Sequence, residues 1–304
     1  MTTTHDDQNT AGPADSGAAV PGSGQQNEGL RVWINGHVYD DAAQAQVSAV
    51  DHGLVVGDGV FEAMKVTEAG VFATTRHLDR LARSASALGL PAPDFDTIRS
   101  GIDAVVADRS WADGKIRITY TGGRGPLGSG AAFGPALVVV AAEAYDRPAS
   151  TCEIVTTPWT RNVHGAMTGV KTTSYGENVR ALAFADANKA AEGIFINSDG
   201  YLCEGTGTNI FLVIGDDVIT PPLKAGPLDG ITRALLLKWC DEIDERDITL
   251  EQAQRADEVF ITSSLRDVQG VTRWDDLTFE APGERTKKIA KVFAERSAAD
   301  IDPT

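Results

Sequence analysis

The longest uninterrupted apolar run in this chain is only seven residues, ALVVVAA at 136–142. A membrane-spanning helix needs about 20 such residues, whereas a short valine-rich run is typical of a buried β-strand. Other strand-like segments alternate with amphipathic helical patterns along the 304 residues. The sequence therefore predicts a mixed α/β (α+β) protein that has no membrane partner.

Acidic side chains outnumber basic ones, 43 to 27, which gives a formal net charge of -16. Such a chain repels nucleic acid and anionic membrane surfaces, so small-molecule chemistry is the expected function class. The N-terminus, MTTTHDDQNT, lacks a basic and then apolar leader, which predicts a cytoplasmic protein. Cys152, Cys203 and Cys240 lack metal-ligand spacing, so neither disulfides nor a metal site is expected.

Composition and turn signals divide the chain into three parts. Residues 1–28 have almost no large apolar side chain and are expected to be a disordered tail. Residues 29–146 are expected to form a small N-terminal α/β domain, and residues 147–304 a larger C-terminal domain. The linker is expected in YDRPAS, where a proline and polar residues separate two strand-like runs.

Periodicity predicts the main elements of both domains. In the first domain, two hairpins are followed by helices at 76–90 and 95–106 and by strands at 115–121 and 136–142. In the second domain, a helix after residue 175 is expected to bury a face that includes Val179 and Leu182. The other expected elements are a strand at 153–157, a meander of short strands at 193–223, helices near 233–242 and 286–297, and a strand at 258–264.

Lys171 stands in the segment GVKTTSY, at a strand-to-helix passage where a capping residue would be usual. A lysine in a partly dry site loses proton affinity and can then act as a Schiff-base nucleophile or a general base. The alternative is a structural or solvent-exposed lysine. Taken alone, the segment does not decide between the two.

Three further segments carry polar groups at suggestive places. Glu204, in YLCEGTGTNIF, is either exposed at a bulge or paired with a cationic ring nitrogen. GITRALLL places Ile231 and Thr232 at a helix start, and ITSSLRD places Ser263 and Ser264 in a turn. Amides at such positions bind phosphate, although each segment alone is equally an ordinary cap or turn.

Together with Arg76 in TTRHLDR, these groups are the ones that pyridoxal 5′-phosphate (PLP) requires. The sequence resembles the class IV, fold type IV, PLP-dependent aminotransferases, a family that includes branched-chain and D-amino acid aminotransferases and 4-amino-4-deoxychorismate lyases. The resemblance extends from Trp33 to the end of the chain. It rests on ordered segments that include GDGVFEAMKV, RHLDRL, GVKTTSY, LCEGTGTNIF, LDGITRALLL and DEVFITSS.

The resemblance implies a role for each candidate residue. Lys171 would bind PLP covalently, Glu204 would pair with the pyridine nitrogen, and Tyr175 would lie near the ring. The implied phosphate-binding residues are Arg76, Ile231, Thr232, Ser263 and Ser264. The implied fold is a small α/β domain beside a larger domain with a β-barrel-like core, with the active site in the cleft between them, in a homodimer.

The partner of the substrate carboxylate is less obvious. D-amino acid aminotransferases and the lyases usually have Arg-Gly where this chain has Thr121-Gly122. Arg124, in the loop that follows, is one candidate, although it is equally a solvated loop arginine. Phe61 and Lys65 are expected to contact the substrate if strand alternation points both into the pocket.

The expected function is transfer of an amino group between an amino acid, or amine, and a 2-oxo acid. The alternative within the family is the lyase, which releases pyruvate from aminodeoxychorismate and leaves 4-aminobenzoate. An alternative from another class is a phosphate-sugar binding module, which would form no imine at Lys171. GLVVGDG lacks GxGxxG spacing and the chain has no GxSxG elbow, so a Rossmann dehydrogenase and a Ser-His-Asp hydrolase are poorly supported.

Overall fold

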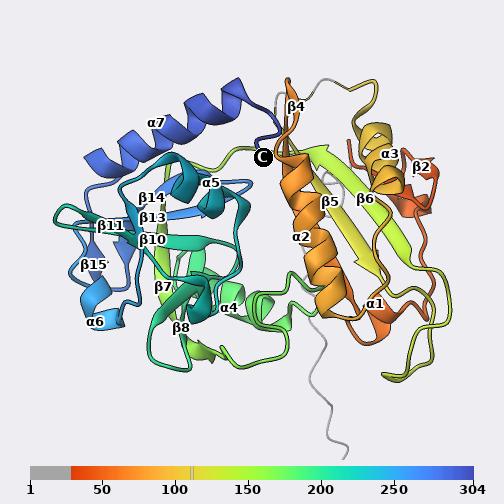
Figure 1. Cartoon of the computed structure of the whole chain (residues 1–304), viewed down its shortest axis with the longest axis horizontal. Coiled ribbons are helices and arrows are strands. Elements are labelled where there is room, and N and C mark those ends of the chain that lie inside the picture. The colour runs from red at the N-terminus through yellow and green to blue at the C-terminus, as the bar shows by residue number, and fades with distance from the viewer. Residues whose placement is uncertain (1–28, 110, 112) are drawn as a thin grey trace, which may run out of the picture.

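The computed structural model describes residues 29–109, 111 and 113–304. The tail expected at residues 1–28 lies outside the described residues. Two curled β-sheets, each with helices packed against it, form the protein (Figure 1). The mixed α/β fold expected from the sequence is therefore confirmed. The expected domain boundary at 146–147 falls in the segment that joins the first sheet to the second.

The first sheet has six strands in the order β2-β1-β6-β5-β3-β4, and every neighbouring pair is antiparallel. Its elements are β1 (Arg31–Ile34), β2 (His37–Tyr39), η1 (Ala42–Gln44), α1 (His52–Val55), β3 (Gly59–Thr67), β4 (Gly70–Val71), α2 (Thr74–Ala87), α3 (Phe95–Val106), β5 (Gly114–Thr121) and β6 (Leu137–Ala144). The helices α2 and α3 cover one face of this sheet, where Met64, Leu78 and Ile98 are fully buried.

The other face of the first sheet carries the side chains that matter for function. Successive strand residues point to opposite faces, so Phe61, Ala63 and Lys65 of β3 share this second face. Arg117 of β5 lies opposite Ala63 in the antiparallel register and joins the same face. An aromatic ring and two cations therefore project away from the helix-covered core.

The second sheet has nine strands, eight of them in the order β12-β11-β10-β13-β14-β7-β8-β9, with β15 paired to β14. Strand β9, at one end of this order, lies back against β10, so the sheet curls into a barrel-like form. Its strands are β7 (Thr151–Arg161), β8 (Glu192–Asn197), β9 (Leu202–Gly205), β10 (Asn209–Ile214), β11 (Asp217–Thr220), β12 (Ile243–Glu245), β13 (Glu258–Ser263), β14 (Asp267–Trp274) and β15 (Leu277–Thr278). The curled interior buries Ile154, Ile210 and Trp274.

The helices of the second half are α4 (Gly176–Ala187), η2 (Leu223–Ala225), α5 (Ile231–Trp239), α6 (Leu250–Ala253) and α7 (Glu284–Ala299). Among the described helices, none is both long and apolar enough to cross a bilayer. Helix α4 is rotated relative to the expectation: Val179 and Leu182 are 64% and 46% exposed, and the buried residues include Asn178 and Ala181. The cause is the Asn178 amide, which donates to the Thr206 carbonyl at 2.5 Å and holds this polar face inward.

The C-terminal segment crosses back to the first sheet at the start of α2 (Figure 1). Ala73, the residue before α2, makes no side-chain cap to the helix. Asp302 takes that role, because its carboxylate accepts from the Thr75 amide at 2.8 Å and from the Thr75 hydroxyl at 2.7 Å. The Ala73 amide donates to the Ile301 carbonyl at 2.8 Å. Residues of the C-terminus therefore complete a helix of the first half.

Candidate active site

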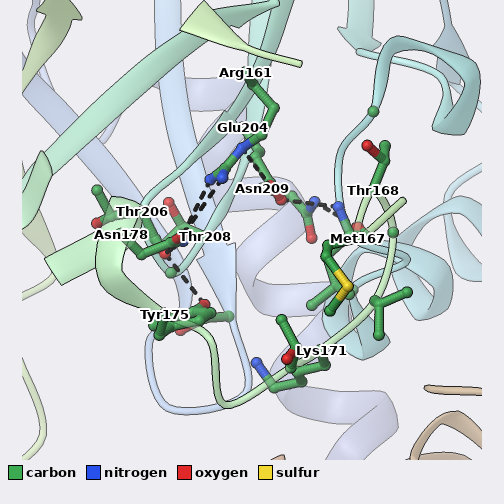
Figure 2. A pocket seen from close by; sticks show the side chains of 18 of the residues that line it. Arg161, Met167, Thr168, Lys171, Tyr175, Asn178, Glu204, Thr206, Thr208 and Asn209 are labelled. Atoms are coloured by element: carbon green, nitrogen blue, oxygen red, sulfur yellow. Dashed lines mark hydrogen bonds and ion pairs between the residues drawn. The ribbon is translucent and has the colours of Figure 1, made fainter. Parts of the chain in front are cut away.

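A cavity of about 420 Å³ lies between the two halves, lined by Ala63 and Arg80 from the first and, from the second, mainly by the segments 165–172, 206–209, 230–232 and 262–265. The structure brings most of the predicted site residues to this one space: Lys171, Tyr175, Glu204, Ile231, Thr232, Ser263 and Ser264. Figure 2 shows Lys171, Tyr175 and Glu204 around it, together with Arg161 and Thr208.

Lys171 is held at the start of β3 by backbone hydrogen bonds. Its carbonyl accepts from the Phe61 amide at 3.0 Å, and the Thr173 amide donates to Gly59 at 2.8 Å. Its Nζ lies 4.3 Å from the centroid of the Phe61 ring. Burial, followed by the nearby charge of Arg80, lowers the pKa of Lys171 from 10.5 to about 8. The unprotonated fraction of this amine near neutral pH is therefore much larger than that of an ordinary lysine.

Tyr175 closes one side of the cavity, at the start of α4. Its ring meets Phe61 edge to face, with centroids 5.1 Å apart, and its hydroxyl donates to the Thr206 carbonyl at 3.3 Å. Burial, followed by the charge of Glu204, raises the pKa of Tyr175 to about 12. The phenol is therefore a neutral hydrogen-bonding group at ordinary pH.

Glu204 faces the cavity from β9, where strand pairing with β8 fixes its backbone. One carboxylate oxygen accepts from the Leu228 amide at 2.8 Å, and the other lies 3.6 Å from Arg161 Nε. Burial raises the pKa of Glu204, and the charge of Arg161 opposes that effect. The guanidinium of Arg161 is itself held over the Phe195 ring, 4.1 Å from its centroid.

One end of the cavity has the features of an anion site. Ile231 and Thr232 are the first two residues of α5, whose free amides and helix dipole favour negative charge. Ser263 ends β13, and the Ser264 hydroxyl lies 3.3 Å from His77 Nε2. The two predicted turns thus meet at one place, although they are about 30 residues apart in the sequence.

Arg80 is the cation at the anion end of the cavity, whereas the resemblance implied Arg76 in this role. Arg80 Nη1 donates to the Asp229 carbonyl at 2.8 Å, just before α5. Arg76 lies one helical turn earlier, outside the cavity, where its Nε donates to the Pro303 carbonyl at 2.9 Å. The expectation for Arg76 was wrong because the C-terminal segment crosses α2 at that turn. The missed signal was the spacing of His77, Arg80 and Ser84, polar residues on the buried face of α2.

A buried carboxylate holds Arg80 in place. Glu62, on β3, is fully buried and accepts from Arg80 Nε at 2.8 Å and from Nη2 at 2.7 Å. It also accepts from His77 Nδ1 at 2.7 Å when that nitrogen carries the proton. Burial lowers the pKa of His77, so the ring is neutral there at ordinary pH. Glu62 and its two partners were not singled out from the sequence.

Two of the three predicted substrate contacts lie elsewhere. Lys65 pairs with Asp267 at 2.6 Å and stands over Phe72, 5.1 Å from its centroid, so it joins the two halves outside the cavity. Arg124 is exposed in the loop after β5, where its backbone is bridged to Asp51. Neither residue lines the cavity in the described part of the chain: alternation sends Lys65 to the expected face, but the Asp267 carboxylate binds it there. Phe61 lies against Lys171 and Tyr175, beside the cavity.

The fold is that of the fold type IV enzymes. The T.th. branched-chain amino acid aminotransferase, solved with pyridoxamine 5′-phosphate, is similar to this chain with a TM-score of 0.81 at 25% sequence identity, covering 88% of this chain and 93% of that one.

Relatives of more than one activity are similar in sequence. The D-alanine aminotransferase of Bacillus licheniformis is 28% identical over 274 residues, which are 86% of this chain and 94% of its own. The aminodeoxychorismate lyase of Bacillus subtilis (strain 168) is 26% identical over 282 residues, 86% of this chain and 93% of its own. The amino-transferase class IV family model matches residues 59–274. This chain belongs to the class IV aminotransferase family, whose members are aminotransferases and lyases.

Proposed function

We propose that this enzyme is a PLP-dependent aminotransferase that moves an amino group between an amino acid, or amine, and a 2-oxo acid. The observation that carries the proposal is the single cavity lined by the Lys171 amine, the Glu204 carboxylate and the N-terminus of α5. The lowering of the Lys171 pKa to about 8 increases the unprotonated, nucleophilic fraction of this amine. The pyridoxamine 5′-phosphate in the T.th. relative supports the choice of cofactor.

The polar atoms of the cavity fit such a ligand. Arg161 Nε, Thr208 Oγ1 and Thr262 Oγ1 line it, are buried, and have no hydrogen-bond partner in the described part of the chain. Buried polar atoms are almost always paired, so these three favour a polar ligand. PLP carries a ring nitrogen, a phenolic oxygen and a phosphate, and could meet that need.

When bound, PLP supplies an electron sink for the bonds at the substrate Cα. The Lys171 amine would hold the cofactor covalently and, once released, would accept the Cα proton of the substrate. Glu204 would hold a proton at the ring nitrogen, with Arg161 favouring the charged carboxylate. Arg80 and the first amides of α5 would bind the phosphate. Tyr175 and Phe61 would limit the access of water on one side.

The lyase is the second candidate, because the Bacillus subtilis lyase matches over 86% of this chain. The same groups would bind aminodeoxychorismate and release pyruvate. The aminotransferase is preferred because the sequence identity to the Bacillus licheniformis D-alanine aminotransferase, 28%, exceeds the 26% identity to the lyase.

The visible spectrum of the PLP-loaded protein tests the two candidates. D-alanine, L-leucine and an aromatic amine are added separately, with no keto acid present. Conversion of the PLP band to the pyridoxamine 5′-phosphate band by any of them is the expected result, and the active donor gives the stereochemistry. A band that survives all three, together with pyruvate release from aminodeoxychorismate, would favour the lyase. A protein that binds no PLP would refute both.

Arg117 is the proposed partner of the substrate carboxylate. Its Cζ lies 3.8 Å from the centroid of the Phe61 ring, and Lys171 Nζ lies 4.3 Å from the same centroid. Within the described residues its side chain donates to Thr119 Oγ1 at 3.2 Å and has no carboxylate in ion-pair contact. Two cations therefore flank one ring, and an anionic substrate would relieve their repulsion.

Replacing Arg117 with methionine is expected to raise KM for the amino acid donor by about 10- to 100-fold, since a hydrogen bond to a charged group is lost. KM for 1-phenylethylamine, which has no carboxylate, should change by less than about threefold. Steady-state kinetics with both donors measure the difference, with Arg124→Met as the matched control. An equal loss with both donors would assign Arg117 a structural role.

The homodimer implied by the resemblance and the cytoplasmic location expected from the N-terminal sequence stay predictions. Leu127 and Phe133, in the loop after β5, are 78% and 70% exposed, which supports a partner at that surface.

A further inference from the structure

Glu192 is a buried carboxylate that the proposed chemistry does not use. It begins β8, is 2% exposed, and lies outside the lining of the 420 Å³ cavity. Its Oε1 accepts from the Gly207 amide at 2.6 Å and from the Thr206 hydroxyl. Its Oε2 lies 3.4 Å from Arg266 Nη2. Three donors from two other segments therefore converge on one side chain.

The first of these segments, residues 205–208, forms one wall of the cavity. Thr206, Gly207 and Thr208 line it, and the Thr206 carbonyl accepts both from the Tyr175 hydroxyl and from the Asn178 amide (Figure 2). The chain is tightly packed here, because a Cβ on Gly205 would lie 2.9 Å from Glu192 Cγ. A shift of this segment would move the acceptor that orients Tyr175.

The second segment, residues 263–266, forms the turn at the anion end of the cavity. The Arg266 amide donates to Ser263 Oγ at 3.2 Å, and the Arg266 guanidinium donates to Gln269 Oε1 at 2.8 Å as well as approaching Glu192. Glu192 therefore connects the wall beside Tyr175 with the turn that holds Ser263. Burial raises the pKa of Glu192, and the charge of Arg266 and the hydrogen bonds from Thr206 and Gly207 oppose that effect.

We propose that Glu192 is a positioning residue that joins the 205–208 segment to the 263–266 turn and thereby fixes the Tyr175 hydroxyl and the anion end of the cavity relative to each other. The inference rests on the proposed function, because it takes PLP to be the ligand held between these two walls. Misplacement of a binding group by about 1 Å costs large factors in rate and affinity, so two independently anchored walls would bind the cofactor less well than two joined ones.

The test compares Glu192→Ala with Glu192→Gln. The dissociation constant for PLP is measured by titrating the apoprotein, and KM and kcat are measured with the best donor found above. Glu192→Ala is expected to weaken PLP binding at least about tenfold and to lower kcat by a similar factor. Glu192→Gln keeps an acceptor for the Gly207 amide and should stay within about threefold of the parent protein.

Glu153→Gln is the matched control, since Glu153 also pairs with an arginine, Arg273, at 2.5 Å, but outside the cavity. A Glu192→Ala protein with a lowered Tm but unchanged PLP affinity and kcat would overturn the inference. Failure of the parent protein to bind PLP would instead refute the proposed function.

If Glu192→Ala is insoluble, Thr206→Val and Thr206→Ser replace it. Loss of PLP affinity with Val but not with Ser supports the inference, and equal affinities overturn it.

Discussion

Replacing Lys171 with alanine is expected to lower kcat/KM by about 10⁴-fold or more, whichever amino donor the enzyme accepts. No other lysine lines the cavity in the described part of the chain. The variant would lose both the covalent attachment of PLP and the base for the Cα proton. Steady-state kinetics measure the loss of activity. Borohydride reduction followed by peptide mass spectrometry measures the loss of attachment, as a pyridoxyl mass on the Lys171 peptide of the parent protein alone.

Lys291→Ala is the control for this experiment, because Lys291 is exposed on α7 and pairs only loosely with Glu295, at 3.8 Å. It should retain full activity and the same labelled peptide. A Lys171→Ala protein that keeps more than about one hundredth of the parent activity would contradict the assignment of Lys171 as nucleophile and base. Retention of the label at another lysine would assign the role to that residue.

Replacing Glu62 with glutamine is expected to lower the free energy of unfolding by about 3–5 kcal/mol, because it leaves the buried Arg80 guanidinium without its counter-charge. Urea unfolding of the apoprotein measures the change, and PLP titration should show weaker binding as Arg80 moves. Glu251→Gln is the control, since its pair with Arg255 is exposed and should contribute at most about 1 kcal/mol. A Glu62→Gln protein as stable as this control would contradict the prediction.

The stabilisation of the folded protein by Glu62 should decrease as the pH is lowered. Burial alone would raise the pKa of Glu62, but the charge and hydrogen bonds of Arg80 hold it well below the usual 4.5. The folded protein therefore binds fewer protons than the unfolded chain in acid. The contribution of Glu62 is complete above the unfolded pKa of 4.5 and is lost as the pH falls from there toward the lower pKa of the folded protein. The difference between parent and Glu62→Gln should accordingly shrink on acidification.

The sequence predicted local elements well where turn residues bound a periodic pattern. Helix α3 spans 95–106, as expected, because Asp94 caps it and its apolar spacing is regular. The face of α4 was wrong, because apolar spacing suggested burial of Val179 whereas hydrogen bonding to Thr206 buries Asn178. Periodicity reports which side chains are apolar, and it does not report where a helix finds a polar partner.

The residues of the candidate site likewise divide into those that the local sequence predicted and those that it did not. Lys171, Glu204 and the two anion-binding turns lie in segments whose own residues suggest the chemistry, and all of them reach the cavity. The cations did not follow this rule. Lys65 and Arg76 are bound by Asp267 and Pro303, which lie 202 and 227 residues away, and no local pattern could reveal those contacts. Long, flexible cations are the residues whose partners depend most on the tertiary fold.

The cap that Asp302 provides to α2 makes the two halves of the protein interdependent. Helix α2 carries Arg80 and His77, yet its first turn is satisfied by a residue 227 positions away. A fragment limited to residues 29–146 would therefore start this helix without its cap, at a cost of about 1 kcal/mol, and would also lose the Ile301 contact. Contacts of such sequence separation form late in folding because they close a very long loop. The first turn of α2 would thus be among the last parts of the molecule to become ordered.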